Sequence, residues 1–394
     1  MEQEKTSIFG KLILLLFIAG CFYGAYFFFF KKSSSPTKNS GSQTKTESSS
    51  GAVEIGIAYG TEKKRWLENA VDQFASTSEG KNIKVNLIPM GSLEGAQSIL
   101  AGNKQIQVWS PASAAYKDIF LEEWSVKYSG NPIYKEDALA LTPMVFVMWD
   151  ERYQAFIQKY KAMNFSTIAQ ALQEKTGWEG IAQKPEWGLF KFGHTHPNQS
   201  NSGLLTLVLM AYDYHKKTKG LTLHDILDPG FQDWMKSIEN GISSFPNSTG
   251  NLMREMILKG PSSYDAVFVY ESVAIDYLKS AEGRWGNLKI IYPQYNMWNE
   301  NPYYIIQAPW VSSDQHDAAE AFLKFLLSDQ VQKDSLNHGF RPGNPTVPIK
   351  FAGSPFVQYA TFGLRVDLSN VAEPPRAEVI NNLLASWQRS EGSR

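Results

Sequence analysis

The stretch VEIGIAYGTEKKRWLENAVDQF, residues 53–74, joins a strand pattern to a helix pattern and decides the fold class. Its apolar, partly β-branched start predicts a strand over Val53–Ala58. Tyr59-Gly60-Thr61 predicts a turn after that strand. Apolar residues then recur at the spacing of one helix face, at Trp66, Leu67, Ala70, Val71 and Phe74. A strand, a turn and a helix in this order predict one unit of an α/β protein.

The same order of strand, loop and helix recurs along the chain, and the loops are rich in small residues. IKVNLIP, residues 83–89, predicts a second strand that ends at Met90-Gly91-Ser92, before another helix. Further strands are predicted at 106–109, 138–149, 264–270, 288–293 and 303–308. Strands that alternate with helices predict α/β sheets that are mostly parallel, with ligands outside the carboxyl ends of the strands.

The segment FGHTHPNQSNSGLLTLVLM, residues 192–210, predicts a strand end, a polar loop and an apolar helix. Ser200 to Ser202 offer an N-cap for a helix that runs from about Gly203. Free backbone N–H groups at a helix N-terminus suit an anion or a polar ligand. The segment is therefore predicted to be a binding loop, with an ordinary capped surface helix as the alternative.

Five predicted strand ends share small residues and neutral hydrogen-bonding groups. Small residues let a ligand approach the backbone N–H groups, and hydroxyls and amides add directional bonds without a formal charge. Turns in general are also rich in serine and glycine, so the pattern has weight only because it repeats. The five loops are Tyr59-Gly60-Thr61, Gly91-Ser92, Ser110 to Ser113, Asn198 to Ser202, and Tyr270 to Ser272.

The N-terminus predicts attachment to a membrane. Leu12 to Phe30 is an uncharged apolar run close to the length that crosses a bilayer, so residues 1–32 are predicted to be a membrane anchor or signal segment. Residues 33–51, rich in Ser, Thr and Lys, predict a disordered linker. Ile18-Ala19-Gly20-Cys21 offers a second reading, in which Cys21 carries a lipid, although apolar residues follow it. The positive charges flank both ends of the run, so the orientation of the anchor stays open.

Composition excludes several function classes for the rest of the chain. The formal net charge is −1, which argues against nucleic acid as a partner. Cys21 is the only cysteine, so the body has no disulfide and no thiol nucleophile or thiol metal site. The sequence lacks the G-x-S-x-G, P-loop, H-E-x-x-H and G-x-G-x-x-G motifs, so neither an enzyme nor a cofactor is expected.

The order of these segments resembles extracellular solute-binding proteins of the class II periplasmic-binding-protein fold, the group that includes molybdate- and tungstate-binding proteins. The resemblance covers residues 52 to about 348. The segments that resemble family segments are IAYGTEKKRW, IPMGSLEGAQSILAG, VWSPASAAY, YDAVFVYESVAIDY and HGFRPGNP.

The resemblance implies a two-lobed α/β fold joined by a hinge that the chain crosses twice, near 141–143 and near 293–302. Lobe one would comprise residues 52–141 plus 296–394, and lobe two residues 142–295. A final helix, Arg376 to Trp387, would pack on lobe one. It also implies a monomeric body outside the cytoplasm, on the periplasmic side of the cell membrane, with an ABC permease as a partner.

Carried over by position, the resemblance implies that Thr61 and Ser92 face the ligand from lobe one, Ser202 or Asn201 from lobe two, and that Tyr270 closes the site. Gly60-Thr61 replaces the paired serines of molybdate binders, and the loop from Gly193 to Gly203 is longer. The ligand is therefore left open between an oxyanion and a polar organic molecule stacked on Tyr59 or Trp109. The predicted ligand-binding residues are Tyr59, Gly60, Thr61, Gly91, Ser92, Ser110, Asn201, Ser202 and Tyr270.

Four charged or histidine groups have both a functional and a structural interpretation. His194 and His196 suggest a metal site, but no second ligand cluster is evident, so a polar loop is preferred. Glu271 is expected to cap the next helix rather than act as a catalytic carboxylate. Lys63-Lys64-Arg65 is expected on an exposed helix face, and Arg341 in a structural salt bridge back to lobe one.

Two function classes follow. The first is a membrane-tethered solute receptor for ABC-type uptake or for sensing. The second is a protein-interaction module of the cell envelope that keeps the fold without a ligand. An enzyme built on this fold ranks third, and the fold by itself gives only an association with transport.

Overall fold

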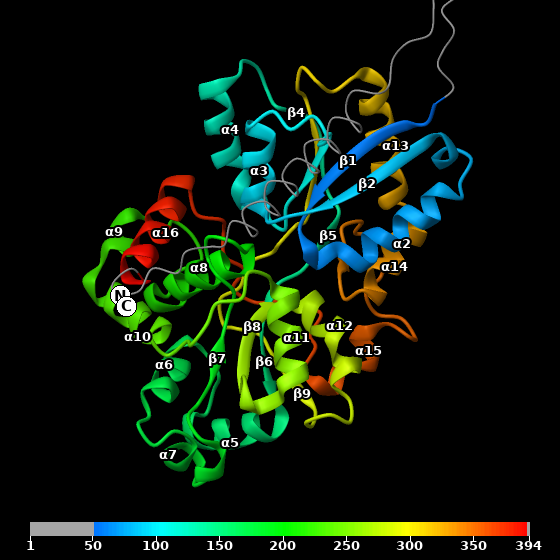
Figure 1. Ribbon diagram of the computed structural model, residues 1–394. Coiled ribbons are helices and arrows are strands. Elements are labelled where there is room, and N and C mark those ends of the chain that lie inside the picture. Colours follow the sequence, from blue (N-terminus) through cyan, green and yellow to red (C-terminus); the bar gives the residue numbers. More distant parts are fainter. Residues whose placement is uncertain (1–50, 392–394) are drawn as a thin grey trace, which may run out of the picture. The chain divides into compact units, whose positions relative to one another are not determined.

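The computed structural model of this chain describes residues 51–391 (Figure 1). Residues 51–394 form one compact unit. The predicted membrane anchor at 1–32 and all but the last residue of the predicted linker at 33–51 lie outside the described residues. A search of the described helices finds none with the length and apolar character of a membrane span.

The first sheet has five strands in the order β2-β1-β3-β10-β4. β1 pairs in parallel with β2 and β3, and β10 runs antiparallel to β3 and β4. The two predicted strands at the start of the body are confirmed. The strands are β1 (Val53–Tyr59), β2 (Ile83–Pro89), β3 (Val108–Ser110), β4 (Ile133–Ala138) and β10 (Pro302–Ile306).

Helices cover both faces of this sheet, and β1, one of its inner strands, is apolar on both sides. Ile55 and Ile57 of β1 pack with Trp66 and Phe322, on the face of α2 and α13, whereas Ala58 packs toward α3. Side chains alternate between the two faces of a strand, so β1 anchors both layers. The helices are α2 (Lys64–Ala75), α3 (Ser92–Leu100), α4 (Lys117–Lys127), α13 (Ser313–Leu326) and α14 (Asp329–Asn337).

The second sheet has four strands in the order β7-β8-β6-β9. Its strands are β6 (Met144–Trp149), β7 (Phe192–Gly193), β8 (Ala266–Tyr270) and β9 (Leu288–Ile291). β6 runs antiparallel to both β8 and β9, and only β7 with β8 is parallel. The prediction of mostly parallel sheets is therefore wrong. β6 enters this sheet directly from the other lobe instead of through a strand–helix–strand crossover, which is the connection that makes neighbours parallel.

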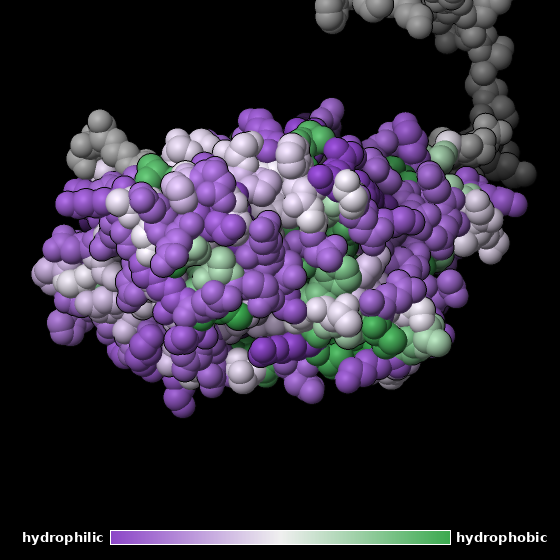
Figure 2. All heavy atoms as spheres, turned by 90° about the horizontal axis from the view of Figure 1, so that it is seen from below, coloured by the Kyte–Doolittle hydropathy of each residue, from purple (hydrophilic) through white to green (hydrophobic). Residues whose placement is uncertain are grey.

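The apolar helix α8 (Asn201–His215) is buried from Asn201 to Asp213, and α6 (Phe165–Gln173), α9 (Leu223–Leu227) and α10 (Pro229–Glu239) pack against it. A helix that is apolar all round is expected in the middle of a packed lobe. The other helices between β6 and β9 are α5 (Asp150–Tyr160), α7 (Trp178–Ala182), α11 (Thr249–Lys259) and α12 (Glu271–Ala281). The face of the molecule drawn in Figure 2 is mostly hydrophilic, with hydrophobic residues in small groups, as is usual for a surface in water.

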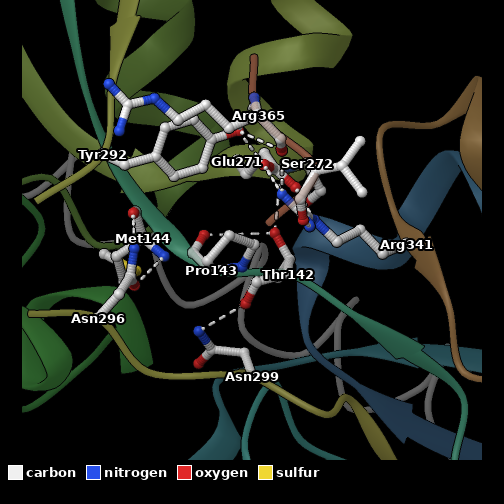
Figure 3. Close-up of polar contacts among 11 residues, drawn as sticks. Thr142, Pro143, Met144, Glu271, Ser272, Tyr292, Asn296, Asn299, Arg341 and Arg365 are labelled. Carbon is white, nitrogen blue, oxygen red and sulfur yellow. Dashed lines mark hydrogen bonds and ion pairs between the residues drawn. The ribbon is translucent and has the colours of Figure 1, made fainter. Parts of the chain in front are cut away.

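The two segments that connect the sheets lie side by side. Thr142 lies between β5 (Ala140–Leu141) and β6, and it pairs with Asn299, which lies between β9 and β10. Their backbone N–H groups each donate to the other residue's carbonyl at 3.0 Å. Asn296 adds a second link, because its side chain accepts from the backbone N–H of Met144 at 2.9 Å and donates to the Met144 carbonyl at 2.8 Å (Figure 3).

The C-terminal part of the chain returns to the second lobe, which differs from the prediction. β11 (Arg341–Pro342) pairs with β5, and α15 (Pro355–Gln358) follows. The last helix, α16 (Ala377–Glu391), packs against α8, α9 and α10 (Figure 1). A last helix packed on lobe one is therefore wrong. The remaining lobe boundaries stay a prediction.

Arg341 forms an ion pair that joins these segments (Figure 3). Its Nε and Nη2 atoms each lie 2.7 Å from one carboxylate oxygen of Glu271, and both side chains are buried. The guanidinium also donates to the carbonyls of Val366 and Arg365, and the Tyr292 hydroxyl donates to Glu271. A structural salt bridge for Arg341 is thus confirmed, but its partner lies on α12 of the second lobe and not on lobe one.

We expect Arg341→Met to lower the free energy of unfolding by about 3–5 kcal/mol, because it leaves the buried Glu271 carboxylate without its cation. Urea unfolding followed by circular dichroism measures this loss. Arg284→Met, at an exposed arginine, is the matched control and should change stability by less than about 0.5 kcal/mol. The double variant Glu271→Met/Arg341→Met should recover part of the loss. Equal effects of the Arg341 and Arg284 variants would contradict the assigned role.

Candidate ligand-binding site

A cavity of about 690 Å³ lies where strand ends and helix starts of the two lobes face each other. That volume is within the range of small-molecule sites. From the first lobe it is lined by Gly60, Thr61, Glu62, Met90, Gly91, Ser92, Leu93, Glu94, Gln97 and Ala112. From the second lobe and α16 it is lined by Asn198, Gln199, Ser200, Asn201, Asn247, Ser248, Thr249, Asn251, Tyr270 and Gln388.

The wall of the first lobe is built on the ends of β1 and β3. The Gly60 N–H donates to the Ser110 carbonyl at 3.1 Å, which holds the turn after β1 against β3. Ser92, the first residue of α3, is buried, and its hydroxyl accepts from the Ala112 N–H at 3.1 Å. The Ser92 hydroxyl keeps its own proton for a further acceptor, such as a ligand atom.

The wall of the second lobe depends on Ser202, a buried residue behind the lining. Its hydroxyl lies 2.7 Å from the Thr195 hydroxyl, 3.1 Å from that of Ser200 and 2.6 Å from that of Thr249. The side chain thus ties the loop before α8 to the start of α11. Ser202 positions the lining residues Ser200 and Thr249 but does not line the cavity itself.

Asn201 and Tyr270 meet in the deepest part of this wall. The Asn201 amide donates to the Tyr270 hydroxyl at 2.8 Å and to the Asn299 side-chain oxygen at 3.0 Å. Both residues are buried and both line the cavity. Burial first, and then the nearby charge of Glu62, raise the pKa of Tyr270 well above its ordinary value. The hydroxyl is therefore protonated at neutral pH and is a donor toward the cavity.

Six of the nine predicted ligand residues line the cavity: Gly60, Thr61, Gly91, Ser92, Asn201 and Tyr270. Tyr59, Ser110 and Ser202 lie behind it, so they support the lining. Stacking of a ligand on Tyr59 or Trp109 is excluded in this arrangement, because both rings are buried in the core and the Trp109 ring packs on Phe120 and Tyr304. As no ligand is present, the roles of the lining residues remain predictions.

Sequence reasoning missed four parts of the lining, and one of them is the start of α3 after Ser92, with Leu93, Glu94 and Gln97. Asn247 to Asn251 belong to the loop PNSTGN, where Ser248 caps α11 by accepting from the Asn251 N–H. This loop has the same composition as the loops that were recognised, so the pattern could have found it. Gln388 could not be found from spacing, because it reaches the cavity from α16. Glu62 directly precedes Lys63-Lys64-Arg65, the segment expected on an exposed helix face.

The first of the three basic residues after β1 is fully buried, which corrects the expected exposed face. Lys63 Nζ lies 2.6 Å from Glu62 Oε1, 3.1 Å from Asn301 Oδ1 and 3.2 Å from the Pro111 carbonyl. Burial lowers the pKa of Lys63, and the Glu62 carboxylate opposes that shift. Lysine, arginine and histidine are absent from the cavity lining formed by the described residues, whereas Glu62 and Glu94 are present.

The two histidines of the 192–210 segment have structural contacts. His194 is buried, with Nε2 2.9 Å from Glu239 Oε1, and the Trp387 indole N–H donates to Glu239 Oε2 at 2.7 Å. His196 packs edge-on against Trp387. Groups of three or more metal-binding side chains were not found within residues 51–391. The Glu239 carboxylate therefore holds α16, and with it Gln388, beside the loop that precedes α8.

A two-lobed α/β body with a polar cavity between the lobes defines the class of binding proteins that close around a ligand. The model of the family "Bacterial extracellular solute-binding protein" matches residues 55–341. This chain belongs to that family, and its fold is that of the class II periplasmic binding proteins. A comparison with curated protein sequences finds no match.

Solved structures support the same fold. The sulfate-binding protein SubI from Mycobacterium tuberculosis H37Rv is similar, with a TM-score of 0.55 and 15% identity over 87% of this chain and 99% of that one. A ferric binding protein from Campylobacter jejuni has a TM-score of 0.56 and 14% identity, over 86% of this chain and 98% of that one. A periplasmic thiamin binding protein has a TM-score of 0.57 and 12% identity, over 86% of this chain and 96% of that one. At such low identities these matches establish the fold alone.

We expect Gly91→Ala to weaken ligand binding without unfolding the protein. A Cβ at Gly91 would lie 2.9 Å from the backbone oxygen of Gln199 on the opposite wall, so the two walls would have to separate. A loss of about 1.4 kcal/mol in binding is a tenfold weaker affinity. Gly250→Ala, with open space at its Cβ, is the matched control. Titration calorimetry measures the affinity of both variants for a solute that the thermal-unfolding panel under Proposed function identifies. Equal affinities of the two variants would refute the close approach of the walls.

Proposed function

We propose that this chain captures a small polar solute in the cavity between its lobes and passes it to an ABC-type permease. The observation that carries the proposal is that both lobes supply hydrogen-bonding groups to one cavity at the hinge. A ligand that contacts both walls binds the closed form better than the open form, so it shifts the population toward closure. A permease can then distinguish loaded from empty protein by the distance between the lobes.

The hydrogen bonds around Asn299 support a coupling between site and hinge. Asn299 pairs with Thr142 through the backbone, and its side chain accepts from Asn201 of the cavity wall. The first two N–H groups of α12 also donate to the hinge, from Glu271 to the Pro143 carbonyl at 2.9 Å and from Ser272 to Thr142 Oγ1 at 3.0 Å. Movement at the cavity wall therefore acts directly on the segments that connect the lobes.

Identification of the solute tests this proposal. Thermal unfolding of the purified full-length chain is measured against molybdate, tungstate, sulfate, phosphate, sugars and organic acids. A solute at about 100 times its Kd should stabilise the protein by roughly 2.7 kcal/mol. Ser92→Ala and Asn201→Ala should abolish the shift, and the matched controls Ser125→Ala and Asn382→Ala, outside the cavity, should keep it.

The alternative function is a protein-interaction module of the cell envelope on the same fold. It predicts that no member of a broad panel changes the melting temperature and that other envelope proteins co-purify with the chain. The similar proteins are named for solutes that range from sulfate through iron to thiamin, so the fold itself does not select one ligand. An oxyanion remains a prediction from the resemblance and from the helix N-terminus near Gly203.

We also propose that the body works outside the cytoplasm, held at the membrane by residues 12–30 and the linker that follows. The length and apolar character of that run support this. Alkaline carbonate extraction of bacterial membranes should leave the full-length chain in the pellet and release a chain that begins at residue 51. Cys21→Ser separates the two forms of attachment, because only a lipid-anchored protein should lose its membrane association. Recovery of the full-length chain in the soluble fraction would refute the tether.

A further inference from the structure

We propose that the ligand is an uncharged organic molecule rich in hydroxyl or amide N–H groups, of the size of a saccharide or polyol, and not a bare oxyanion. This inference rests on the proposed function, since it takes the cavity as the solute site. Four features of the cavity support it: a buried acceptor without a donor, the absence of cations from its lining, an amide-rich wall and its volume.

The orientation of the Asn201 side chain follows from its neighbours. The Thr142 carbonyl can only accept, so the atom of Asn299 that lies 3.0 Å from it must be the amide nitrogen. The other end of the Asn299 amide, its oxygen, then faces Asn201. Asn201 must present its own nitrogen there, and the two hydrogens of that nitrogen go to Asn299 and Tyr270. The amide of Asn201 therefore has one allowed orientation.

This orientation leaves Asn201 Oδ1 as an acceptor without a donor. The atom is buried and has no hydrogen-bond partner among the described residues, and Asn201 lines the cavity. A buried acceptor without a donor is unfavourable, because it has lost its hydrogen bonds to water without a replacement. A ligand O–H or N–H group removes that cost, whereas sulfate or molybdate offers only acceptors and would be repelled. The neighbouring Tyr270 hydroxyl is free to donate, so this corner matches a ligand hydroxyl, which both donates and accepts.

The charges near the cavity also disfavour an anion. Glu62 and Glu94 line it, and the nearest buried cation, Lys63, is occupied by Glu62, Asn301 and the Pro111 carbonyl. A positively charged ligand gains little from Glu62, because Lys63 already balances that carboxylate at 2.6 Å, and Glu94 is exposed to solvent. An uncharged ligand avoids repulsion by both carboxylates.

Three N–H groups at the starts of α3 and α12 already have protein acceptors, whereas the sequence analysis expected an anion or a polar ligand at the start of α8. Glu94 Oε2 accepts from the Gly91 N–H at the start of α3, at 3.1 Å. The Glu271 and Ser272 N–H groups at the start of α12 donate to the hinge. An anion gains stabilisation at a helix N-terminus only from N–H groups that point at it. The remaining lining is mostly neutral, with amide side chains at Gln97, Asn198, Gln199, Asn247, Asn251 and Gln388.

The volume of the cavity also favours an organic ligand over a bare oxyanion. Water has one oxygen and takes roughly 30 Å³, so a tetrahedral anion with four oxygens fills only a small part of about 690 Å³. A mono- or disaccharide brings many hydroxyls, each able to donate and accept, to a wall of amides with the same property.

The test compares three classes of probe on the full-length chain at matched ionic strength. The uncharged probes are glucose, mannitol and sucrose, the anions are sulfate and molybdate, and the cation is putrescine. We expect at least one uncharged probe to raise the melting temperature, equally at low and high salt, and the other two classes to leave it unchanged. Asn201→Ala and, as a second variant, Ser92→Ala should reduce the affinity for that probe tenfold or more. Asn382→Ala is the matched control, and circular dichroism checks that each variant is folded.

Each other outcome overturns the inference in a distinguishable way. A shift with sulfate, molybdate or putrescine alone refutes the ligand class but supports solute capture. A shift with an uncharged probe that survives both cavity variants refutes the assignment to this cavity. The absence of a shift with every probe refutes the ligand class and the proposed solute capture together.

Discussion

The side chain of Asn299 is the constraint on which the arrangement of hinge and site depends. It donates to the Thr142 carbonyl on the neighbouring crossing segment and accepts from Asn201 on the cavity wall. An amide is the smallest side chain that offers a donor and an acceptor at fixed positions, so one residue can orient both neighbours. Replacement by aspartate would keep the size but remove the donor, and a carboxylate oxygen would then face the Thr142 carbonyl.

A polar side chain that is buried without a hydrogen-bond partner costs free energy of folding. At the hinge, nearly all of the buried polar side chains have a partner. Asn296, Asn299 and Asn301 are all buried, and each bonds to the backbone of the opposing crossing segment. Apolar residues would hold the two segments together equally well but would allow several registers, whereas directional hydrogen bonds allow one. Two exceptions among the described residues are Ser272 Oγ, at the start of α12, and Asn201 Oδ1, for which a ligand can supply the donor because Asn201 lines the cavity.

The sequence was sufficient for the parts of the structure that depend on local pattern. Strands β1 and β2, the turn at Gly60 and the start of α8 near Ser200 all follow from periodicity, small residues and capping. Burial of Lys63 could not be predicted in this way, because its partner Asn301 is 238 residues away. The same reason applies to α16: its amphipathic pattern predicts a helix, but the lobe that receives it is decided by Trp387 and Glu239, which meet only in the folded chain.

The predictions that failed share one cause. The same cause explains why the sequence left the class of ligand open. Residues that line a cavity were chosen by their position at strand ends, and this identifies backbone geometry well. Charge and orientation depend on the second residue of each pair: Lys63 opposite Glu62, Glu94 over the Gly91 N–H, and Asn299 beside Asn201. A resemblance in the order of loops carries the fold across distant relatives, but it does not carry these pairs. The chemistry that selects the solute therefore has to be argued from the contacts of this chain, and those contacts describe a site without cations in its lining and with a buried acceptor that has no protein donor.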